Sequence, residues 1–351
     1  MGSVRILVTG AGPSGCAFAI TAARRGHAVT LVDEGRRRPP WTGESLPAGG
    51  RELLESVFGA GVLDGQAVSH GTAAAWGSPE LAAHDFMAHW SGMGWHVDRT
   101  VLDPRLHAAC ADAGVDVRVG GTVDRIDSEW VIDATGRAGA IAARRGAQQQ
   151  RFDDQIALVA TVPDLGGERV TTVESCEAGW WYSQPVGNGD RVIALITDAD
   201  LVDVARRDGQ AGPVGLARRD GHAAPVGLDR ADFWSRHLAG TEHIRRHVEA
   251  LPADVAAYPA GATMRDPIVG EDWLAVGDAA VSFDPMSSQG LITGVVMAAH
   301  AAIALDRGPQ ALEDWAADYR VVLDEHRQVR SAFWAQESRW PDAPFWSRRA
   351  G

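Results

Sequence analysis

The sequence contains no lysine, so all 33 of its basic residues are arginine, and any function that depends on a catalytic lysine is excluded. Cysteine is also scarce. The three cysteines, Cys16, Cys110 and Cys176, share no metal-ligand spacing and cannot all pair, which favours a reducing, cytoplasmic compartment. Only 3 tyrosines accompany 13 tryptophans, an unusual preference for indole among the aromatic side chains.

Further absences bear on the possible partners. The net charge of −13 argues against a nucleic-acid partner, because binding to phosphates depends on clustered cations. No uninterrupted apolar run approaches the length that spans a membrane, and the N-terminus shows no signal-peptide pattern. Among the 12 histidines, the candidates His70 and His96 show no H-x-x-H or similar ligand spacing, so no metal site is expected.

The length and composition are those of a globular protein. With 351 residues, 45% hydrophobic and 23% charged, the chain can bury a large core as one large domain or two intimately joined ones.

The first motif is a glycine turn between two β-type runs. Val4–Thr9 is a short apolar strand, an alanine-rich helix covers Cys16–Arg25, and a second strand covers Ala28–Val32. Within such a unit, the G-x-G-x-x-G turn permits close approach of a pyrophosphate. A carboxylate after the second strand can accept hydrogen bonds from the ribose hydroxyl groups. The alternative is a Rossmann-like turn that binds no nucleotide. The residues expected at the nucleotide are Gly10, Ala11, Gly12, Pro13, Ser14, Gly15, Asp33 and Glu34.

The middle of the chain alternates in the manner of β-strands. Four runs separated by turn residues, 155–162, 170–174, 179–185 and 191–197, indicate an antiparallel sheet inserted in the dinucleotide fold. Other expected elements are helices over 51–58, 102–113, 231–250 and 310–330 and strands over 115–119 and 122–126. A near-duplication, 206–217 against 218–229, is interpreted as a repeated surface loop.

Two later motifs complete the nucleotide-facing set. Asp133-Ala-Thr135-Gly136 ends a strand, and Gly277-Asp278 follows the strand Trp273–Val276. Asp284-Pro285 and Ser287-Ser288-Gln289-Gly290 then lead into an apolar helix that continues through Leu291 to Leu305. The N-terminus of this helix presents unpaired N–H groups and a positive dipole to something electron-rich.

The glycine turn Gly10–Gly15 with Asp33, the Asp133–Gly136 motif and Gly277-Asp278 follow one another in this order. The set resembles the motifs of FAD-dependent aromatic hydroxylases. The resemblance implies FAD, with Arg99 and Asp278 at its phosphate and ribityl region and Pro285 lining the ring. It also implies that amides around Ser288, Gln289, Gly290 and Leu291 stabilise the pyrimidine side of the flavin, together with the predicted contacts of Asp133, Thr135, Gly136 and Gly277. For Arg99 the alternative is an ordinary surface arginine.

Further motifs resemble those of flavin-dependent tryptophan halogenases: Gly43-Glu44-Ser45, Gly179–Pro185 and Asp284–Ser288. The W-x-W-x-I-P pattern has Tyr182 at its second tryptophan and Gln184 in place of isoleucine, and the family's catalytic lysine is absent. The chain resembles more fully the halogenase-like branch that hydroxylates tryptophan during maturation of quinone-cofactor amine and amino-acid oxidases. The motifs for this branch are Ser69–Thr72, Trp76–Ser78, Gly94–Arg99, Gly179–Tyr182, Thr197-Asp198 and Arg339–Trp346.

The resemblance implies an FAD monooxygenase that acts through a flavin C4a-hydroperoxide, using O2 and electrons from NAD(P)H directly or through a separate flavin reductase. The expected acceptor is an aromatic small molecule or a tryptophan-bearing polypeptide. The candidate catalytic residues are Glu44, His70, Trp181, Pro285 and Ser288, with His96 and Trp180 beside them. Glu44 either orients substrate and relays a proton or caps a helix, and Trp180 and Trp181 either line the substrate or fill the sheet core.

The expected architecture is α/β: a Rossmann-like FAD-binding domain with an inserted antiparallel β-sheet substrate domain, as in the aromatic hydroxylases and halogenases, and a helical C-terminus. The FAD-binding parts are expected at 1–68, 101–150 and 261–308, with a substrate- and flavin-lining segment at 69–100. The substrate domain is expected at 151–260 and the C-terminal helical segment at 309–351. Alternative functions are a flavin halogenase, an FAD dehydrogenase or C=C reductase, and a flavin-binding maturation partner without enzymatic activity.

Overall fold

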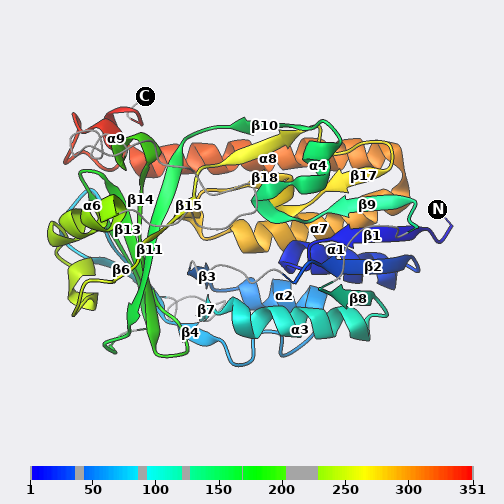
Figure 1. The fold of residues 1–351 in the computed structure, drawn as a ribbon, viewed down its shortest axis with the longest axis horizontal. Coiled ribbons are helices and arrows are strands. Elements are labelled where there is room, and N and C mark those ends of the chain that lie inside the picture. Colours follow the sequence, from blue (N-terminus) through cyan, green and yellow to red (C-terminus); the bar gives the residue numbers. More distant parts are fainter. Residues whose placement is uncertain are drawn as a thin grey trace.

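The computed structural model describes residues 2–35, 43–85, 93–120, 127–167, 169–202 and 228–349. Two parts lie end to end (Figure 1): a parallel sheet with its helices near the N-terminus, and a large second sheet near the C-terminal end of the chain. The expected α/β architecture with an inserted sheet and a helical C-terminus is confirmed. The expected strand 122–126 and nearly all of the duplicated loop lie outside the described residues.

The parallel sheet has the strand order β17-β9-β1-β2-β8. Its strands are β1 (Arg5–Thr9), β2 (Ala28–Asp33), β8 (Asp116–Val119), β9 (Trp130–Asp133) and β17 (Trp273–Ala275). The chain adds β2 and β8 on one side of β1, and β9 and β17 on the other. The boundary between β1 and β9 is therefore a topological switch point, and a ligand is expected at the carboxyl ends of these strands.

Helices α1 (Pro13–Arg24), α3 (Arg99–Asp112) and α7 (Gly290–Arg307) pack together beside the parallel sheet, with α2 (Gly50–Phe58) against α1 and α7. Helix α8 (Pro309–Trp334) runs along the molecule from the parallel sheet to the large sheet (Figure 1). The other described helices are α4 (Ala140–Arg144), α6 (Leu228–Ala239), α9 (Pro344–Ser347), η2 (Gly136–Ala138), η3 (Ile244–His247), η4 (Gly277–Ala279) and η5 (Pro285–Ser287).

The large sheet has seven strands in the order β15-β11-β14-β13-β12-β5-β6. Its members are β5 (Gly71–Ala75), β6 (Ala82–Asp85), β11 (Gln155–Pro163), β12 (Val170–Cys176), β13 (Gly179–Pro185), β14 (Asp190–Asp198) and β15 (Ala256–Pro259). The four strands expected from the alternating runs are confirmed. The sheet is antiparallel except that β5 pairs in parallel with β12, so part of the 69–100 segment belongs to this sheet.

Two three-stranded sheets connect these parts. One is β3 (Glu44–Leu46), β7 (Gly94–Val97) and β4 (Ala67–Ser69), and the other is β10 (Gln148–Arg151), β16 (Thr263–Asp266) and β18 (Val281–Ser282). Helix α3 begins three residues before the expected position because the Asp98 carboxylate accepts the Thr100 N–H at 2.8 Å and caps the helix.

Helix α7 is, among the described residues, the one helix long and apolar enough to cross a membrane by length and composition alone. The core helix of a globular protein passes the same test. Here α7 packs against α1 and α8, and Val295, Ala298 and Ala301 are fully buried in the core. Its apolar character is therefore explained by packing within the protein.

Candidate functional site

The glycine turn brings the backbone close to the end of β9. Gly10 has a φ of +102°, and a Cβ there would lie 2.2 Å from the Ala134 carbonyl oxygen. A Cβ at Gly15 would lie 2.0 Å from the Gly10 carbonyl oxygen. Neither position can accept a side chain without movement of the backbone. Nε2 of His107, on α3, lies 3.0 Å from the Ala11 carbonyl oxygen and supports the turn from behind.

The N-termini of α1 and α7 converge at Ser14. A Cβ at Gly277 would lie 2.3 Å from Ser14 Oγ, and one at Gly294 would lie 2.7 Å from it. Neither helix has a side-chain cap from its N-cap residue or an acidic residue in its first turn. The first N–H groups of both helices thus have no carboxylate in their own first turn, which leaves the positive helix ends able to bind an anion.

Asp133 and Thr135 build a turn at this edge. The Asp133 carboxylate is fully buried; Oδ1 accepts the Thr135 N–H at 3.0 Å, and Oδ2 accepts the N–H groups of Ile141 and Ala142 at 2.9 and 2.8 Å. Thr135 Oγ1 donates to Asp133 and accepts the Ala140 N–H. Because both Asp133 oxygens are already used, the structure does not support the predicted direct contact of Asp133 with the cofactor.

Asp33 lies at the carboxyl end of β2, beside Gly10, whose N–H donates to the Val32 carbonyl oxygen. Its Oδ1 accepts the Gly35 N–H at 3.0 Å, and the neighbouring Glu34 is exposed. Asp33 thus occupies the position at which a ribose is expected in this topology.

A group of charged side chains lies between the glycine turn and the large sheet. Arg99 Nη1 lies 3.1 Å from Glu44 Oε1, and Arg99 Nε lies 2.7 Å from Asp103 Oδ1; we call these three residues the Glu44 cluster. Burial lowers the pKa of Arg99, but the two carboxylates raise it more, so the guanidinium stays charged. Its Nη2 is buried without a hydrogen-bond partner among the described residues. A further acceptor, such as a phosphate oxygen, is expected there.

Asp278 lies close to this cluster. Burial raises its pKa, whereas Arg137 lowers it, with Nε of Arg137 at 3.9 Å from Asp278 Oδ2. Although other residues lie close around Asp278, 47% of its side-chain surface is accessible, so its carboxylate can be reached by a ligand. Arg137 also donates to the Gly261 and Phe283 carbonyl oxygens.

The Asp284–Ser288 motif forms a turn directly before α7. Asp284 Oδ1 accepts the Met286 N–H at 3.1 Å and caps η5, which begins at Pro285. Ser288 has a φ of +52°, a left-handed conformation that is costly for a residue with a Cβ and is often found at functional sites. Its Oγ lies 3.0 Å from Ser45 Oγ, so the G-E-S motif and this turn meet.

These observations fit FAD. Gly10, Gly15 and Gly277 remove the side chains that would close the edge, and a Cβ at Gly136 or Gly290 would meet no described atom within 4 Å. The unpartnered Arg99 Nη2, the accessible Asp278 and two uncapped helix N-termini match a ligand that carries phosphates and a polar chain. Within the described residues, no group of three or more His, Cys, Asp or Glu side chains could hold a metal ion.

The large sheet presents aromatic side chains toward this edge. The aromatic wall consists of Trp76, Trp180, Tyr182 and Trp346, in which the rings of Trp180 and Tyr182 are 6.2 Å apart and Trp76 meets Trp180 and Trp346 edge-on at 6.3 and 5.5 Å. A Cβ at Gly43 would lie 3.1 Å from the Tyr182 ring, and Gln184 donates to the Glu44 carbonyl oxygen. Burial and the Glu44 carboxylate both raise the pKa of Tyr182.

Trp181 does not belong to this wall. Adjacent strand residues face opposite sides, and Trp181 is fully buried on the other face of the sheet, with its ring 5.1 Å from that of Trp234 on α6. The position of its ring therefore contradicts the catalytic role that the sequence predicted for Trp181. The His70 N–H donates to the Arg169 carbonyl oxygen, and no contact of its side chain with the site appears in the described part of the chain. Burial lowers the pKa of the fully buried His96 to about 4, so its ring is neutral at pH 7.

Several residues of the site were not expected from the sequence. Ser45 belongs to the quoted G-E-S motif and Arg137 directly follows the D-A-T-G motif, so the motifs identify the region but not these contacts. Trp76 and Trp346 belong to quoted motifs, but no local pattern indicates that the Trp76 ring contacts both Trp180 and Trp346, which come from segments distant in the sequence.

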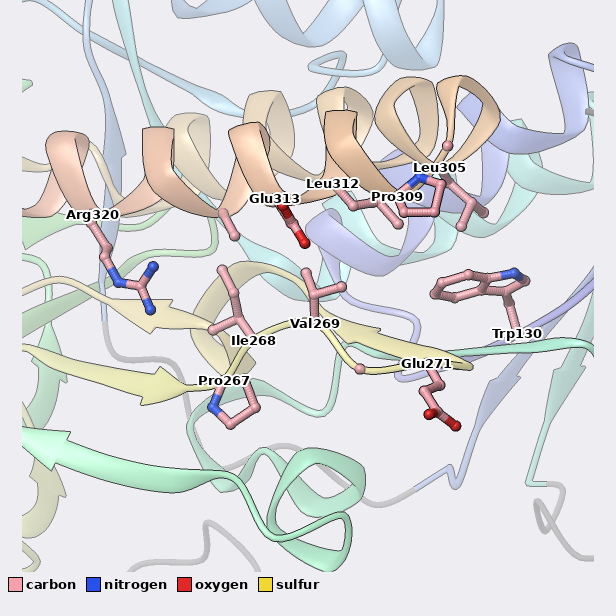
Figure 2. A pocket seen from close by; sticks show the side chains of 13 residues that line it. Trp130, Pro267, Ile268, Val269, Glu271, Leu305, Pro309, Leu312, Glu313 and Arg320 are labelled. Carbon is pink, nitrogen blue, oxygen red and sulfur yellow. The ribbon is translucent and has the colours of Figure 1, made fainter.

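A separate cleft of about 580 Å³ lies between the Pro267–Gly270 segment and the start of α8 (Figure 2). Ile268, Val269 and Leu312 project toward it, with Arg320 and Glu313 at its rim (Figure 2). It includes Trp130, the first residue of β9, and therefore lies at the amino ends of the strands. None of the predicted site residues lines it.

Comparisons with known proteins agree with this geometry. No family model matches the chain. A putative FAD-dependent oxidoreductase, LodB of Marinomonas mediterranea, is 25% identical over 389 residues, which cover 99% of this chain and 97% of the relative. A tryptophan 2-halogenase of Chondromyces crocatus is 24% identical over 233 residues, which cover 57% of this chain and 44% of the halogenase.

Two solved structures share the fold. The peptidyl tryptophan dihydroxylase QhpG, essential for tryptophylquinone cofactor biogenesis, has a TM-score of 0.79 and 24% identity, covering 100% of this chain and 79% of that chain. The flavin-dependent halogenase CmlS has a TM-score of 0.80 and 20% identity, covering 99% and 68% of the two chains. The expected resemblance to FAD-dependent monooxygenases and halogenases is confirmed, and the chain is a flavin-dependent enzyme.

Proposed function

We propose that this flavin-dependent enzyme is a monooxygenase that hydroxylates the ring of an indole or tryptophan, free or carried on a polypeptide. The observation that carries the proposal is the position of the aromatic wall. Tyr182 packs near Gly43, while the adjoining Glu44 and Ser45 contact Arg99 and Ser288. An aromatic ring against the wall would therefore lie beside the edge where the cofactor is expected.

FAD, once reduced, supplies the activation of O2. The protein's part is to bind and orient. The first N–H groups of α1 and the Arg99 guanidinium would bind the diphosphate, Asp33 the ribose, and Asp278 the ribityl hydroxyls. The first N–H groups of α7, with Ser288, Gln289, Gly290 and Leu291, would face the pyrimidine side of the flavin, where the positive helix end stabilises negative charge.

Glu44 is the residue best placed to act between cofactor and acceptor. Its carboxylate contacts Arg99, its carbonyl oxygen accepts from Gln184, and its charge reaches Tyr182. It could orient an indole N–H or take up the proton that the ring loses on hydroxylation. Trp76 and Tyr182, the partly exposed members of the aromatic wall, would stack on the acceptor, while the buried Trp180 and Trp346 support them from within the core.

The electron donor is proposed to be NAD(P)H, either directly or through a separate flavin reductase, because the sequence has no second glycine fingerprint. A tryptophan-bearing polypeptide as acceptor is supported by the QhpG resemblance, since that protein is a peptidyl tryptophan dihydroxylase. The halogenase alternative is supported by the similarity to a tryptophan 2-halogenase. The lack of any lysine in this chain opposes it.

One reaction series separates these functions. The purified protein is incubated with FAD, NAD(P)H, a flavin reductase, O2 and a tryptophan-containing peptide or free tryptophan, with and without bromide, and products are identified by mass. We expect incorporation of oxygen in both cases. A brominated product would favour the halogenase and refute the argument from lysine. Without O2, reduction of the substrate by NAD(P)H would favour a C=C reductase, and oxidation of the substrate with an added electron acceptor in place of NAD(P)H would favour a dehydrogenase. If the protein retains no bound flavin, as judged by its visible absorption after addition of FAD and removal of the unbound cofactor, the whole proposal is refuted.

A further inference from the structure

A buried group of charged residues lies behind the Asp284 turn, on the side of α8. Arg330 Nη1 lies 2.7 Å from Asp153 Oδ2 and 2.8 Å from Asp284 Oδ2. His326 Nε2, one helical turn earlier on α8, lies 3.1 Å from the same Asp284 oxygen. We call Asp153, Asp284, His326 and Arg330 the Asp284 cluster.

This cluster is too deep to be an ordinary surface salt bridge. Arg330 is 6% exposed and Asp284 is 3% exposed. Burial raises the pKa of the Asp284 carboxyl, but the hydrogen bond from His326 and the charge of Arg330 lower it more, so it is ionised. A buried carboxylate paired in this way contributes to a unique geometry more reliably than to stability.

The two oxygens of the Asp284 carboxylate bind different groups. Oδ2 is bound by Arg330 and His326, while Oδ1 accepts the Met286 N–H and caps the turn that begins at Pro285. The position of the turn is therefore set by side chains that lie more than forty positions further along the chain. The turn leads through the left-handed Ser288 into α7, so its displacement would also move the α7 N-terminus.

Arg330 also contacts the substrate side of the molecule. Its Cζ lies 4.3 Å from the centre of the Trp334 ring, a cation–π contact. Trp334 belongs to the same hydrophobic cluster as Trp180 and Trp346, and Met286 of the turn packs against this cluster. The ring of Phe283, just before the turn, lies edge-on to His326 at 4.9 Å.

We propose that Arg330 and His326 are positioning residues that stabilise, through Asp284, the turn Pro285–Ser287 and the start of α7 against the flavin, in register with the aromatic wall. This inference rests on the proposed function for the place of the flavin. The observation that carries it is the single buried Asp284 carboxylate that joins two α8 side chains to the cap of the turn.

The test compares bound FAD in four variants. Arg330→Met removes the guanidinium at similar length, and His326→Phe keeps the ring contact with Phe283 but removes the bond to Asp284. Arg330→Lys is the conservative variant, because both carboxylates are bound through one nitrogen that an ammonium can replace. Arg327→Met is the matched control, since Arg327 also lies on α8 but stacks on Phe152 and pairs with Asp324.

The measurements are the visible absorption band shape of bound FAD, the FAD dissociation constant, and the share of reducing equivalents lost as hydrogen peroxide. We expect Arg330→Met to alter the band shape, to raise peroxide release, and to lower coupled hydroxylation by about 100-fold, as expected for misplacement of about 1 Å. His326→Phe should act in the same direction but less strongly. Arg330→Lys should largely restore the wild-type spectrum, and Arg327→Met should match wild type.

The failures are distinguishable. If wild-type protein binds no FAD, the proposed function is wrong. If wild-type protein binds FAD and both Arg330→Met and His326→Phe give the spectrum, affinity and peroxide release of Arg327→Met, the inference alone is overturned. If Arg330→Met does not fold, His326→Phe and Arg330→Lys decide by the same three measurements.

Discussion

Replacing Gly277 by alanine tests the close approach of η4 to the N-terminus of α1 at Ser14. Gly277 has a φ of +58°, in the left-handed region, where an L-residue costs about 1–2 kcal/mol. A Cβ there would also lie 2.3 Å from Ser14 Oγ and 2.7 Å from Ser14 Cβ. Because the Ser14 Cβ cannot rotate away, the clash adds an overpacking cost of about 1–3 kcal/mol. We therefore expect the free energy of unfolding to fall by about 2–5 kcal/mol.

The same change should weaken FAD binding, because η4 must move away from α1 at the edge where the first N–H groups of α1 and the Asp278 carboxylate are expected to bind the cofactor. Each 1.4 kcal/mol expressed at the site would raise the FAD dissociation constant about tenfold. Urea unfolding of the protein without FAD and titration followed by flavin fluorescence measure the two effects separately.

Two further variants separate the cost of the clash with Ser14 from the cost of the left-handed conformation at position 277. Adding Ser14→Gly to Gly277→Ala should remove the clash and leave the left-handed cost of about 1–2 kcal/mol. Gly294→Ala places a Cβ 2.7 Å from Ser14 Oγ alone, which a hydroxyl rotation relieves, and it gains about 1 kcal/mol of helix propensity. It should therefore be neutral or raise the free energy of unfolding by up to about 1 kcal/mol. If Gly277→Ala binds FAD as the wild type does, or if Ser14→Gly restores nothing, the convergence at Ser14 does not form the cofactor site.

The remaining predictions concern charge and the tryptophan pair. Because burial raises the pKa of Asp278, Asp278→Asn should increase the unfolding free energy of FAD-free protein at pH 7, with the gain vanishing as pH falls below the carboxyl range, and should weaken FAD binding. Burial raises the pKa of Glu337, but Arg339 lowers it more, to about 2, so Glu337→Gln should destabilise at neutral pH, with the difference lost between pH 4.5 and 2 in urea unfolding. Both tryptophans are buried, so Trp180→Phe and Trp181→Phe should both lower the melting temperature, but only Trp180→Phe should also raise the KM for the acceptor; a KM effect of Trp181→Phe alone would refute the assignment of the two faces.

Much of the parallel sheet could be predicted because its signals are local. Val4–Thr9, the glycine turn and Ala28–Val32 lie within about thirty residues, and each element has its own apolar run and punctuation. The four long strands of the large sheet were predicted for the same reason. The parallel pairing of β5 with β12 was not, because it joins segments about one hundred residues apart.

The candidate site was predicted as a set of motifs rather than as a set of contacts. Asp133 shows the difference. A carboxylate at the end of a strand is compatible with a ligand contact, but here both oxygens accept backbone N–H groups of the turn and α4. No sequence pattern states whether such a carboxylate is used by the ligand or by the turn that approaches it.

Partners that are distant in the sequence were also missed. Arg330 and His326 lie on a long polar helix with ordinary i, i+4 spacing, which a sequence reading assigns to a solvated face. Their role becomes apparent only in the structure, where both side chains contact the Asp284 carboxylate. The Ser14 contact with Gly277 and Gly294 is of the same kind, since small residues indicate close approach but not what approaches.

In the tryptophan motif of β13, side chains alternate between the two faces of the sheet, and this alternation relates core stability to acceptor specificity. Trp180 and Tyr182 point to the aromatic wall, while Trp181, between them, fills the core against Trp234 on α6. A one-residue shift of β13 against its neighbours would exchange these faces and place Trp181 toward the cofactor edge. The register with β14 is opposed to such a shift, because Trp181 pairs with Leu195 and Trp180 with Ile196, which lie in the same two cores. The packing of Trp181 against Trp234 on α6 therefore helps to fix the register that leaves Trp180 and Tyr182 on the side of the acceptor.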